Sequence, residues 1–239
     1  MAEVRSSEPV AFRIAEIAPV THDTKSFKFR LEEDAALDFL PGDHLMMHAD
    51  LNGRPEYRPY TPASTPDDTG FFELIIKRYP DGLMSNYIHN KKVGDEVLLE
   101  GAIPGGHFEF GMADSIGMVA GGAGITPMIS IIRTIIRRGY DVEMTLLFAN
   151  KTEQDIILRQ EFESYGVRHK NFKYVFALDE LPPGWTGPAG FIDTDLIKQH
   201  LPAPDLKPLI YLCGPPMMEY KLREKILALG YDKNRLIIP

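Results

Sequence analysis

Apolar and polar positions follow two different rhythms in the two halves of this chain. Before about residue 111, short apolar segments are separated by turn residues such as Pro41-Gly42 and Asn52-Gly53, and few of them have the period of a helix. The pattern predicts strands at residues 10–18, 26–31, 44–49, 71–78 and 96–100, with one short helix near residues 85–90. Closely spaced strands with little helix indicate an antiparallel β-barrel of the Greek-key kind.

From residue 116 onward, strand-like apolar segments alternate with amphipathic helical segments. The predicted strands are 116–120, 143–149, 174–178, 209–213 and 235–238, and the predicted helices are 127–138, 154–165, 193–200 and 216–229. Such alternation is typical of a Rossmann-like α/β fold, a parallel sheet with helices on both faces. The change of rhythm predicts a domain boundary near Gly111, with one domain at residues 1–111 and a second at residues 112–239.

Composition narrows the class of protein. With 239 residues, of which 44% are apolar, the chain is long enough for two domains that each bury a core. The formal net charge of -8 argues against a nucleic-acid partner. No apolar stretch reaches the length of a membrane span and no secretion signal is visible, so we expect a cytoplasmic protein without an anchor. The single cysteine, Cys213, excludes an internal disulfide and an iron–sulfur cluster held by the cysteines of this chain.

A candidate ligand site lies in residues 58–64, which read Arg-Pro-Tyr-Thr-Pro-Ala-Ser. Arg58 can bind phosphate oxygens with its planar guanidinium, Tyr60 can lie against a flat ring, and Thr61 can hydrogen bond to a ring nitrogen. The two prolines restrict the backbone between these groups. A ligand with a diphosphate and a flat polar ring fits this set, and FAD is such a ligand. Alternatively, the segment is only an edge strand with an exposed arginine and a buried tyrosine.

A second candidate site follows the predicted strand 116–120. Residues 121–127 read Gly-Gly-Ala-Gly-Ile-Thr-Pro and lead into an amphipathic helix, which is where an open parallel sheet binds dinucleotides. Glycines let a diphosphate approach the backbone, and a helix with Thr126 as its cap and Pro127 as its first residue would offer N–H groups to an anion. Because Pro127 replaces the third glycine of the usual G-x-G-x-x-G fingerprint, the segment could instead be a turn needed for close packing.

The segment Cys213-Gly214-Pro215-Pro216 repeats this arrangement, since it ends a predicted strand and precedes a helix. Both loops should therefore face one crevice. Cys213 could also be an ordinary buried thiol. No neighbouring base in the sequence would make it a nucleophile, so we do not expect covalent catalysis.

Residues 148–153 end the second predicted strand of this half, where a Rossmann-like domain usually meets the adenosine ribose of its dinucleotide. An NADPH site is expected to place an arginine there for the 2′-phosphate, whereas this segment offers one lysine, Lys151, and one glutamate, Glu153. The pattern favours NADH, and Lys151 keeps NADPH open.

Taken together, these segments resemble the ferredoxin-NADP reductase superfamily, most closely its cytochrome b5 reductase and nitrate reductase branch. The resemblance covers nearly the whole chain, and its motifs occur in the expected order. They are PGDHL (41–45), RPYTPAS (58–64), IIKRY (75–79), GLMSNY (82–87), VGD (93–95), PGGHF (104–108), GGAGITPM (121–128), FANKTEQDI (148–156) and CGPPMM (213–218).

The resemblance implies FAD and NADH as cofactors and a role for each motif. Arg58 would bind the FAD diphosphate, Tyr60 the isoalloxazine face and Thr61 the flavin N5 edge, while Thr126 and Cys213 would lie at the nicotinamide. Tyr60, Thr61, Thr126 and Cys213 are thus the implied catalytic residues. A contact from Asp179 is a weaker inference. The implied cofactor-binding residues are Arg58, Pro59, Tyr60, Thr61, Ile75, Lys77, Tyr79, Gly82, Leu83, Met84, Ser85, Gly121, Gly122, Gly124, Thr126, Pro127, Phe148, Asn150, Cys213, Gly214, Pro215, Pro216 and Met217.

The implied reaction is hydride transfer from NADH, less readily from NADPH, to the N5 atom of bound FAD. One-electron transfer to an external ferredoxin, haem protein or oxygenase component would follow. Only the cofactors react, so the protein needs no general acid or catalytic dyad. Two alternatives stay open: a reductase of free flavin or FMN without tightly bound FAD, and a non-enzymatic nucleotide-sensing subunit of a larger complex.

Three features depart from the family pattern. Ala123 stands where many relatives have threonine, and the segment between Lys77 and Gly82 is short, which leaves the contacts to the adenosine end of FAD uncertain. Many relatives also end in an aromatic residue that shields the flavin, whereas this sequence ends in Ile237-Ile238-Pro239.

The histidines, a group of arginines and the single tryptophan have simpler interpretations. The seven histidines show no metal-binding spacing, so we predict structural or solvated roles and no metal site. Three arginines, Arg133, Arg137 and Arg138, fall in the predicted helix 127–138. Their positive charge compensates the helix dipole or, alternatively, forms a docking patch for an acidic partner. Trp185 lies in a proline- and glycine-rich loop and is interpreted as a lid or packing residue.

Overall fold

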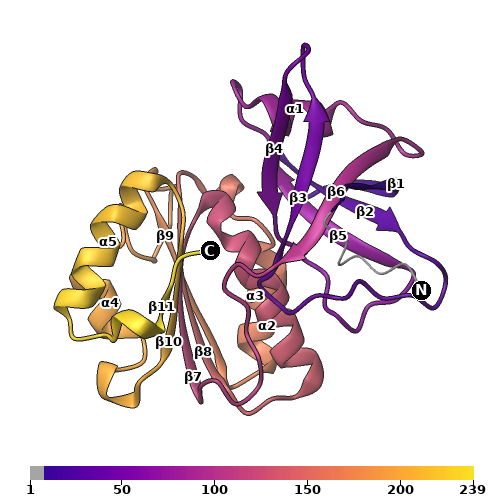
Figure 1. Cartoon of the computed structure of the whole chain (residues 1–239). Coiled ribbons are helices and arrows are strands. Elements are labelled where there is room, and N and C mark those ends of the chain that lie inside the picture. Colours follow the sequence, from indigo (N-terminus) through magenta and orange to yellow (C-terminus); the bar gives the residue numbers. More distant parts are fainter. Residues whose placement is uncertain (1–7) are drawn as a thin grey trace. The chain divides into compact units, whose positions relative to one another are not determined.

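The computed structural model describes residues 8–239 (Figure 1). The chain divides into two compact units. The first unit extends to Phe108 and also includes Ile129–Thr134, whereas the second comprises Glu109–Met128 and Ile135–Pro239.

The first unit is an antiparallel sheet that closes on itself. Its strands pair in the order β4-β3-β6-β1-β2-β5. After β4, a bridge between Pro62 and Leu74 and a hydrogen bond of 2.7 Å from Ala63 N to Glu73 O join the two ends of this order. The closure confirms the predicted β-barrel. The elements are β1 (Val10–Pro19), β2 (Thr24–Arg30), β3 (His44–Asp50), β4 (Pro55–Tyr60), β5 (Phe71–Lys77), α1 (Leu83–His89) and β6 (Glu96–Ile103).

Aromatic residues fill the interior of this barrel. The Phe72 ring stacks on Phe29 with centroids 5.0 Å apart and meets Phe12 edge-on at 5.1 Å. Met84 and Ile88 of α1 are buried in the same cluster, so the short helix plugs the barrel. Each such side chain contributes about 1.5–3 kcal/mol through burial, which explains why a helix of seven residues forms here.

The apolar pattern did not predict strand β4, because its residues include Pro55 and Pro59, but β4 matches the alternative interpretation of the Arg58 segment as an edge strand. Proline cannot donate a ladder hydrogen bond and is therefore confined mainly to edge strands. In the structure β4 pairs only with β3 within the strand order of the described residues, which leaves its other side open to prolines. This strand carries the residues of the first candidate site.

The second unit is a five-stranded parallel sheet with the order β11-β10-β7-β8-β9, as predicted for a Rossmann-like fold. Phe148 of β8 meets Phe162 of α3 on one face, while Leu147 packs with residues of α4 and α5 on the other (Figure 1). The elements are β7 (Ser115–Gly121), α2 (Thr126–Arg138), β8 (Glu143–Asn150), α3 (Arg159–Arg168), β9 (Phe172–Leu178), α4 (Thr194–His200), β10 (Leu209–Cys213), α5 (Pro216–Ala228) and β11 (Leu236–Ile237).

The predicted helix at residues 154–165 is interrupted in the structure. A 3-10 turn at Glu153–Asp155 precedes α3, and Leu158 between them has a left-handed backbone with φ of 56°. Asp155 and Thr152 cap the turn reciprocally, and the next residues, Ile156 and Ile157, are buried. Burial of this apolar pair outweighs helical continuity, so α3 begins five residues later than the predicted helix.

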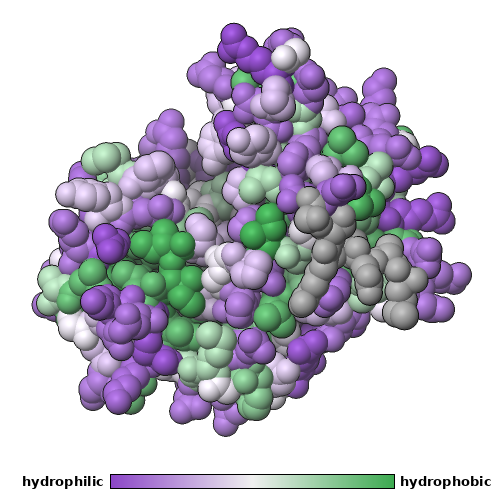
Figure 2. Space-filling model, in the orientation of Figure 1, coloured by the Kyte–Doolittle hydropathy of each residue, from purple (hydrophilic) through white to green (hydrophobic). Residues whose placement is uncertain are grey.

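The helices of this structure were compared with the length needed to cross a membrane. Within residues 8–239, we find no helix with both the length and the apolar content to cross a bilayer. The longest, α2 and α5, have 13 residues each, whereas a span needs about 20. On the face shown in Figure 2, polar residues predominate and apolar ones form separate patches, which is ordinary for a protein surface.

Candidate functional site

Arg58 and Tyr60 lie on one face of β4, because alternate residues of a strand point the same way. The Arg58 side chain is 57% exposed, its Nη1 donates to Tyr57 O at 2.7 Å, and it lies 3.3 Å from the Glu56 carboxylate. The guanidinium is therefore held at the surface by weak partners. A phosphate would compete with Glu56 for it, and a bidentate phosphate contact is stronger than an exposed ion pair.

Tyr60 and Thr61 are more enclosed than Arg58. The Tyr60 ring packs against the barrel core, and burial raises its pKa to about 12, an effect that the nearby Arg58 charge reduces and that Tyr79 increases. The phenol is thus neutral at any physiological pH. Thr61 is buried, with 7% of its surface exposed, at the point where the chain leaves β4 for β5.

Lys77, expected to line the flavin, is paired with Asp23 in the structure. Its ammonium lies 2.8 Å from the Asp23 carboxylate, and its side chain is only 15% exposed. Burial raises the pKa of Asp23, but hydrogen bonds from Lys77, Thr21 and Thr24 outweigh it and leave the pKa below its ordinary value. Ile75 on the same strand is buried, and Tyr79 beyond its end is about half exposed.

The segment from Tyr79 to Ser85 is a tight turn held by two side chains. Ser85 Oγ accepts from Tyr79 N at 3.1 Å and donates to Gly82 O at 3.1 Å, while Asn86 Nδ2 donates to the carbonyls of Tyr79, Pro80 and Gly82. A Cβ on Gly82 would lie 2.4 Å from Ser85 Oγ, so a larger residue would displace the hydroxyl that holds the turn. Asn86 was not among the predicted site residues, because nothing in its local sequence indicates three carbonyl partners.

Gly82 is the N-cap of α1, and no side chain among residues 8–239 caps this helix. The first N–H groups of a helix have no partner within it and can bind an anion. Two of the implied phosphate-binding residues differ in exposure, since Leu83 is 54% exposed whereas Met84 is buried in the barrel core. Met84 could therefore contribute through its backbone only.

In the second unit, the structure brings the two glycine-containing loops together. β7 and β10 lie side by side, with Cys213 paired to Ala120. A Cβ on Gly124 would lie 2.1 Å from Cys213 O, and one on Gly121 would lie 2.4 Å from Met218 Sδ. A Cβ on Gly214 would lie 3.3 Å from the backbone of Gly121. The loops pack backbone against backbone at the carboxyl ends of adjacent strands, the position at which open α/β sheets bind ligands.

The predicted helix cap at Thr126 is wrong. Residues Gly122–Ile125 form a 3-10 turn, so Thr126 is already helical, and its hydroxyl donates to Ala123 O at 3.0 Å. Pro127 is the second residue of α2 rather than the first. Gly122 has φ of 52°, and a Cβ there would meet nothing within 4 Å, so this turn has an open side. The predicted cap fails because the chain already turns helically at Gly122–Ile125, one turn before α2 begins.

Burial and Glu219 together keep Cys213 as a thiol, and Glu219 was not among the residues predicted from the sequence. Burial, then the negative charge of Glu219 and a hydrogen bond to it, raise the pKa of Cys213 to about 12. Glu219 Oε1 also accepts from Gly214 N at 2.9 Å and so fixes the loop. A thiol with this pKa is a poor nucleophile at neutral pH, which agrees with the expectation of no covalent catalysis.

Phe148 and Asn150, at the end of β8, differ in environment. Phe148 is fully buried and meets Phe162 and Phe176 edge-on at 6.4 and 6.2 Å, so its side chain belongs to the core. Asn150 is 5% exposed, and neither atom of its side-chain amide has a hydrogen-bond partner among the described residues. A buried amide without partners is costly, and a missing ligand is one explanation for it.

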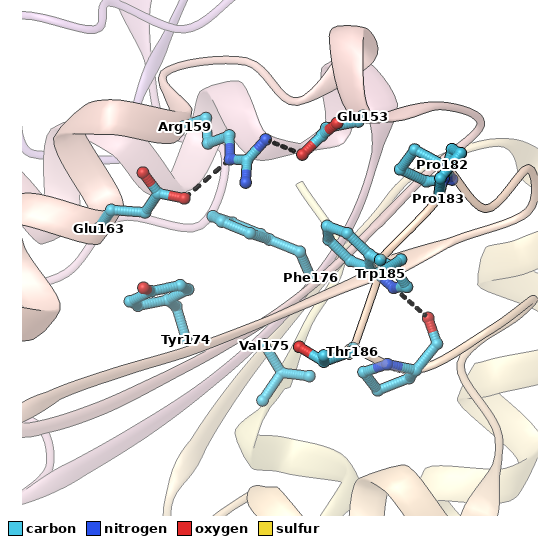
Figure 3. Close-up of a pocket in the computed structure, with 13 residues that line it drawn as sticks. Glu153, Arg159, Glu163, Tyr174, Val175, Phe176, Pro182, Pro183, Trp185 and Thr186 are labelled. Carbon is cyan, nitrogen blue, oxygen red and sulfur yellow. Dashed lines mark hydrogen bonds and ion pairs between the residues drawn. The ribbon is translucent and has the colours of Figure 1, made fainter.

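A cavity of about 410 Å³ lies beside β9 in the second unit (Figure 3). Tyr174, Phe176 and Trp185 contribute aromatic walls, and Trp185 Nε1 donates to Pro188 O at 3.2 Å. Arg159 is bound between the carboxylates of Glu153 and Glu163. Trp185 therefore lines this cavity. This position is compatible with its interpretation as a lid or packing residue.

Three histidines in the first unit make short polar contacts. His89 Nε2 lies 2.8 Å from Ile76 O, His48 Nε2 lies 2.7 Å from Glu100, and His107 Nδ1 lies 3.3 Å from Asp43. These contacts fit the structural roles that were predicted for them.

Two family models match this chain. The oxidoreductase FAD-binding domain model matches residues 11–110, and the oxidoreductase NAD-binding domain model matches residues 118–224. Since residues 111–117 belong to neither match, the boundary at Gly111 stays a prediction.

The chain is similar along most of its length to named proteins. The chain is 38% identical over 229 residues to NADH-cytochrome b5 reductase 1 of Dictyostelium discoideum, covering 94% of this chain and 79% of the relative. It is 40% identical over 226 residues to NADH-cytochrome b5 reductase 1 of Mortierella alpina, covering 93% and 75%. Among solved structures, the cytochrome b5 reductase domain of Ulva prolifera nitrate reductase aligns over 100% of both chains with a TM-score of 0.91 and 28% identity.

Proposed function

Because this chain belongs to the NADH-cytochrome b5 reductase family of FAD- and NAD-binding oxidoreductases, we propose that it passes electrons from NADH through FAD to an external haem protein. The observation that carries this proposal is the identity of 38–40% with reductases of that name over more than nine-tenths of the chain. The use of FAD and NADH follows from membership of the family, whereas the electron acceptor and the roles of individual residues are proposals.

The residues of the first unit fit a flavin diphosphate. Arg58 supplies an exposed cation, and no side chain of residues 8–239 caps the first N–H groups of α1 beside Gly82. We propose that Arg58 and the backbone of Gly82–Ser85 bind the diphosphate, that Tyr60 supports the ring face and that Thr61 hydrogen bonds to the ring edge.

The residues of the second unit fit a nicotinamide dinucleotide. Gly121, Gly124 and Gly214 hold the two loops together at the carboxyl ends of β7 and β10, and Gly122 leaves one side of its turn open. Asn150 offers a buried amide without a hydrogen-bond partner among the described residues. We propose that the glycine loops bind the diphosphate and that Cys213 and Thr126 shape the nicotinamide site. When bound, NADH supplies a hydride and FAD releases the resulting pair of electrons singly. The chain's own task is to orient the rings, and Tyr60 and Cys213, each with a pKa of about 12, keep their protons throughout.

Charge at the end of β8 and β9 supports NADH over NADPH. Lys151 lies 3.3 Å from Glu180, and Arg159 is bound by Glu153 and Glu163. The nearby cations are thus matched or exceeded by carboxylates, so a 2′-phosphate would meet repulsion rather than a dedicated arginine. We expect kcat/KM for NADPH to be lower by about tenfold or more.

Stopped-flow spectroscopy of the flavin-loaded protein tests this proposal. The flavin absorbance should bleach on mixing with NADH and far more slowly with NADPH. Equal rates with the two nucleotides would contradict the NADH preference, and failure of both to bleach the flavin would contradict the function itself. A colourless protein that reduces added free flavin would favour the free-flavin reductase instead.

The acceptor is tested separately after flavin reduction has been established. We expect reoxidation by cytochrome b5 to exceed reoxidation by a ferredoxin or an oxygenase iron–sulfur component at equal concentration. Faster electron transfer to either of the latter would replace the haem protein as the proposed partner. We also propose a cytoplasmic location, which cell fractionation tests.

A further inference from the structure

Hydrogen bonds to strand β5 hold the two residues that follow Thr61 and Pro62 in the first unit. Ala63 N donates to Glu73 O at 2.7 Å, and Glu73 N donates to Ser64 Oγ at 3.1 Å. Ala63 and Ser64 are both buried. None of the roles proposed above uses these two residues, although they belong to the same motif as Thr61.

Helix α2 holds the same two residues through their carbonyl groups. Ser130 Oγ donates to Ser64 O at 2.9 Å, and Arg133 Nη1 donates to Ala63 O at 2.8 Å. Ser130 and Arg133 are three residues apart and therefore lie on one face of the helix. Both are in the segment Ile129–Thr134, which belongs to the first unit. The backbone at residues 63–64 is thus fixed from two sides.

The Glu73 carboxylate connects the two sides. Its Oε2 lies 2.7 Å from Arg133 Nη1, and its Oε1 accepts from Ser26 Oγ of β2. The side chains of Glu73 and Arg133 are 15% and 19% exposed, so water and salt screen this ion pair only weakly. A carboxylate held by two donors has a fixed orientation, and it keeps the guanidinium directed at Ala63 O.

This anchor lies next to the hydroxyl that is proposed to hydrogen bond to the flavin ring edge. Only Pro62 separates Thr61 from Ala63, and the ring of a proline fixes its backbone angle φ. Threonine is branched at Cβ and has few side-chain rotamers. The position of the Thr61 hydroxyl therefore depends on the backbone that follows it, and Glu73 and Arg133 hold that backbone.

We propose that Arg133 and Glu73 are positioning residues for flavin reduction, because they fix the backbone of Ala63–Ser64 and so hold the Thr61 hydroxyl where the flavin ring edge binds. The inference rests on the proposed function, since it presupposes a flavin at Thr61. The two residues act only through the chain that they hold. A shift of about 1 Å in a reacting geometry can slow a reaction by about 100-fold, so loss of the anchor should affect the rate of flavin reduction more than the binding of FAD.

A double-mutant cycle tests this proposal, with the limiting rate of flavin reduction at saturating NADH as the measurement. The wild type, Arg133→Met, Thr61→Val and the double variant are compared, each loaded with FAD and kept well below its unfolding temperature. Arg133→Met should lower the rate per bound flavin by about tenfold and leave the Kd of FAD within about twofold. In the Thr61→Val background the same change should cost less than about twofold, because the hydroxyl that Arg133 positions is then absent.

Two further variants make the cycle decisive. Arg137→Met, at an exposed position of the same helix, is the matched control and should leave the rate unchanged. Ser130→Ala removes the bond to Ser64 O without removing a charge, and it replaces Arg133→Met in the cycle if that variant does not fold. Lower stability alone would reduce the amount of folded protein in both backgrounds, but it would not change the rate per bound flavin.

A loss of rate that depends on the presence of Thr61 supports the proposal. Equal losses in both backgrounds, no loss in either, or a fall in FAD affinity as large as the fall in rate would overturn it. If NADH did not reduce the flavin of the wild type, the proposed function would fail and this inference with it. The two failures can be told apart, because the first appears only in the variants and the second already in the wild type.

Discussion

At the scale of single residues, the motif positions differ in how their side chains are engaged. Arg58 is exposed and only weakly paired, whereas Lys77 is committed to Asp23 at 2.8 Å. Cys213 is kept protonated by its burial and by Glu219. Motif membership alone therefore does not tell whether a side chain is available to a ligand.

Arg58 and Thr61 should have separable effects on the flavin. Arg58→Ala should weaken flavin retention, with a rise in Kd of about tenfold or more, because it removes a charge-assisted contact to phosphate. Thr61→Val should slow reduction by NADH with little loss of bound flavin, since only a hydrogen bond at the ring edge is lost. Dialysis followed by flavin absorbance measures retention, and stopped-flow spectroscopy measures reduction. Equal reduction rates in the wild type and Thr61→Val would remove the role proposed for Thr61.

The Cys213 thiol should react slowly with iodoacetamide at pH 8, because its pKa of about 12 leaves little thiolate. Glu219→Gln should speed alkylation, since it removes the negative charge that helps raise this pKa. Mass spectrometry of the labelled peptide gives both rates, and the urea-unfolded chain gives the rate of an unperturbed thiol. If wild type and variant were labelled equally fast in the folded state, Glu219 would have no influence on the thiol.

At the scale of elements, local pattern located most strands and helices, and the exceptions have tertiary causes. The apolar pattern missed β4 because its prolines are tolerated only at the edge position it occupies, a position that only the alternative interpretation of residues 58–64 named. Helix α3 starts late because Ile156 and Ile157 are buried. Helix α1 is short and is stabilised by burial in the barrel, where His89 near its end donates to Ile76 O of β5.

His89 should make the first unit sensitive to acid. Its pKa is lowered mainly by burial and further by Lys25 and Arg78, against the raising effects of the Ile76 hydrogen bond and Asp23. At this histidine the unfolded chain therefore binds a proton more readily than the folded chain. The contribution of neutral His89 to the free energy of unfolding is complete above the ordinary pKa of 6.5 and is lost as the pH falls through the lower pKa of the folded state. Urea unfolding followed by circular dichroism should give a smaller free energy of unfolding at pH 5 than at pH 7.

The variant His89→Gln isolates this contribution from that of other groups. Glutamine can still donate a hydrogen bond but does not titrate, so the difference in free energy of unfolding between pH 7 and pH 5 should shrink. His44, whose pKa burial also lowers, remains in both proteins and accounts for part of the residual slope. An identical pH dependence in the wild type and the variant would contradict the assignment to His89.

At the scale of the whole molecule, the division into compact units does not follow the sequence order strictly. Ile129–Thr134, from the middle of α2, belongs to the first unit with the barrel. Within that unit, Ser130 Oγ donates to Ser64 O at 2.9 Å, and Arg133 Nη1 lies 2.7 Å from Glu73 and donates to Ala63 O at 2.8 Å. Arg133 is therefore a structural residue, which argues against its part in a docking patch.

Removal of the Arg133 guanidinium should destabilise the protein. Arg133→Met keeps the aliphatic bulk but leaves the Glu73 carboxylate, which is 15% exposed, without its cation. We expect a loss of about 1–3 kcal/mol in the free energy of unfolding, because a partly buried charge loses its strongest partner. Urea unfolding measures it, and Arg137→Met, at an exposed position on the same helix, is the control. Equal stabilities of the two variants would contradict this account of Arg133.

The sequence by itself determined the alternation of strands and helices, the barrel and the parallel sheet, the family, and the glycine positions of both candidate sites. These depend on periodicity and on residue types within short segments, which are local properties of the chain. Only the tertiary structure decided that Gly124 lies against Cys213 O, that Lys77 pairs with Asp23, that Glu219 controls the Cys213 thiol, and that Arg133 pairs with Glu73. Most of these contacts join residues far apart along the chain, and even the Cys213–Glu219 contact depends on the path of the loop between them, so no local pattern specifies them.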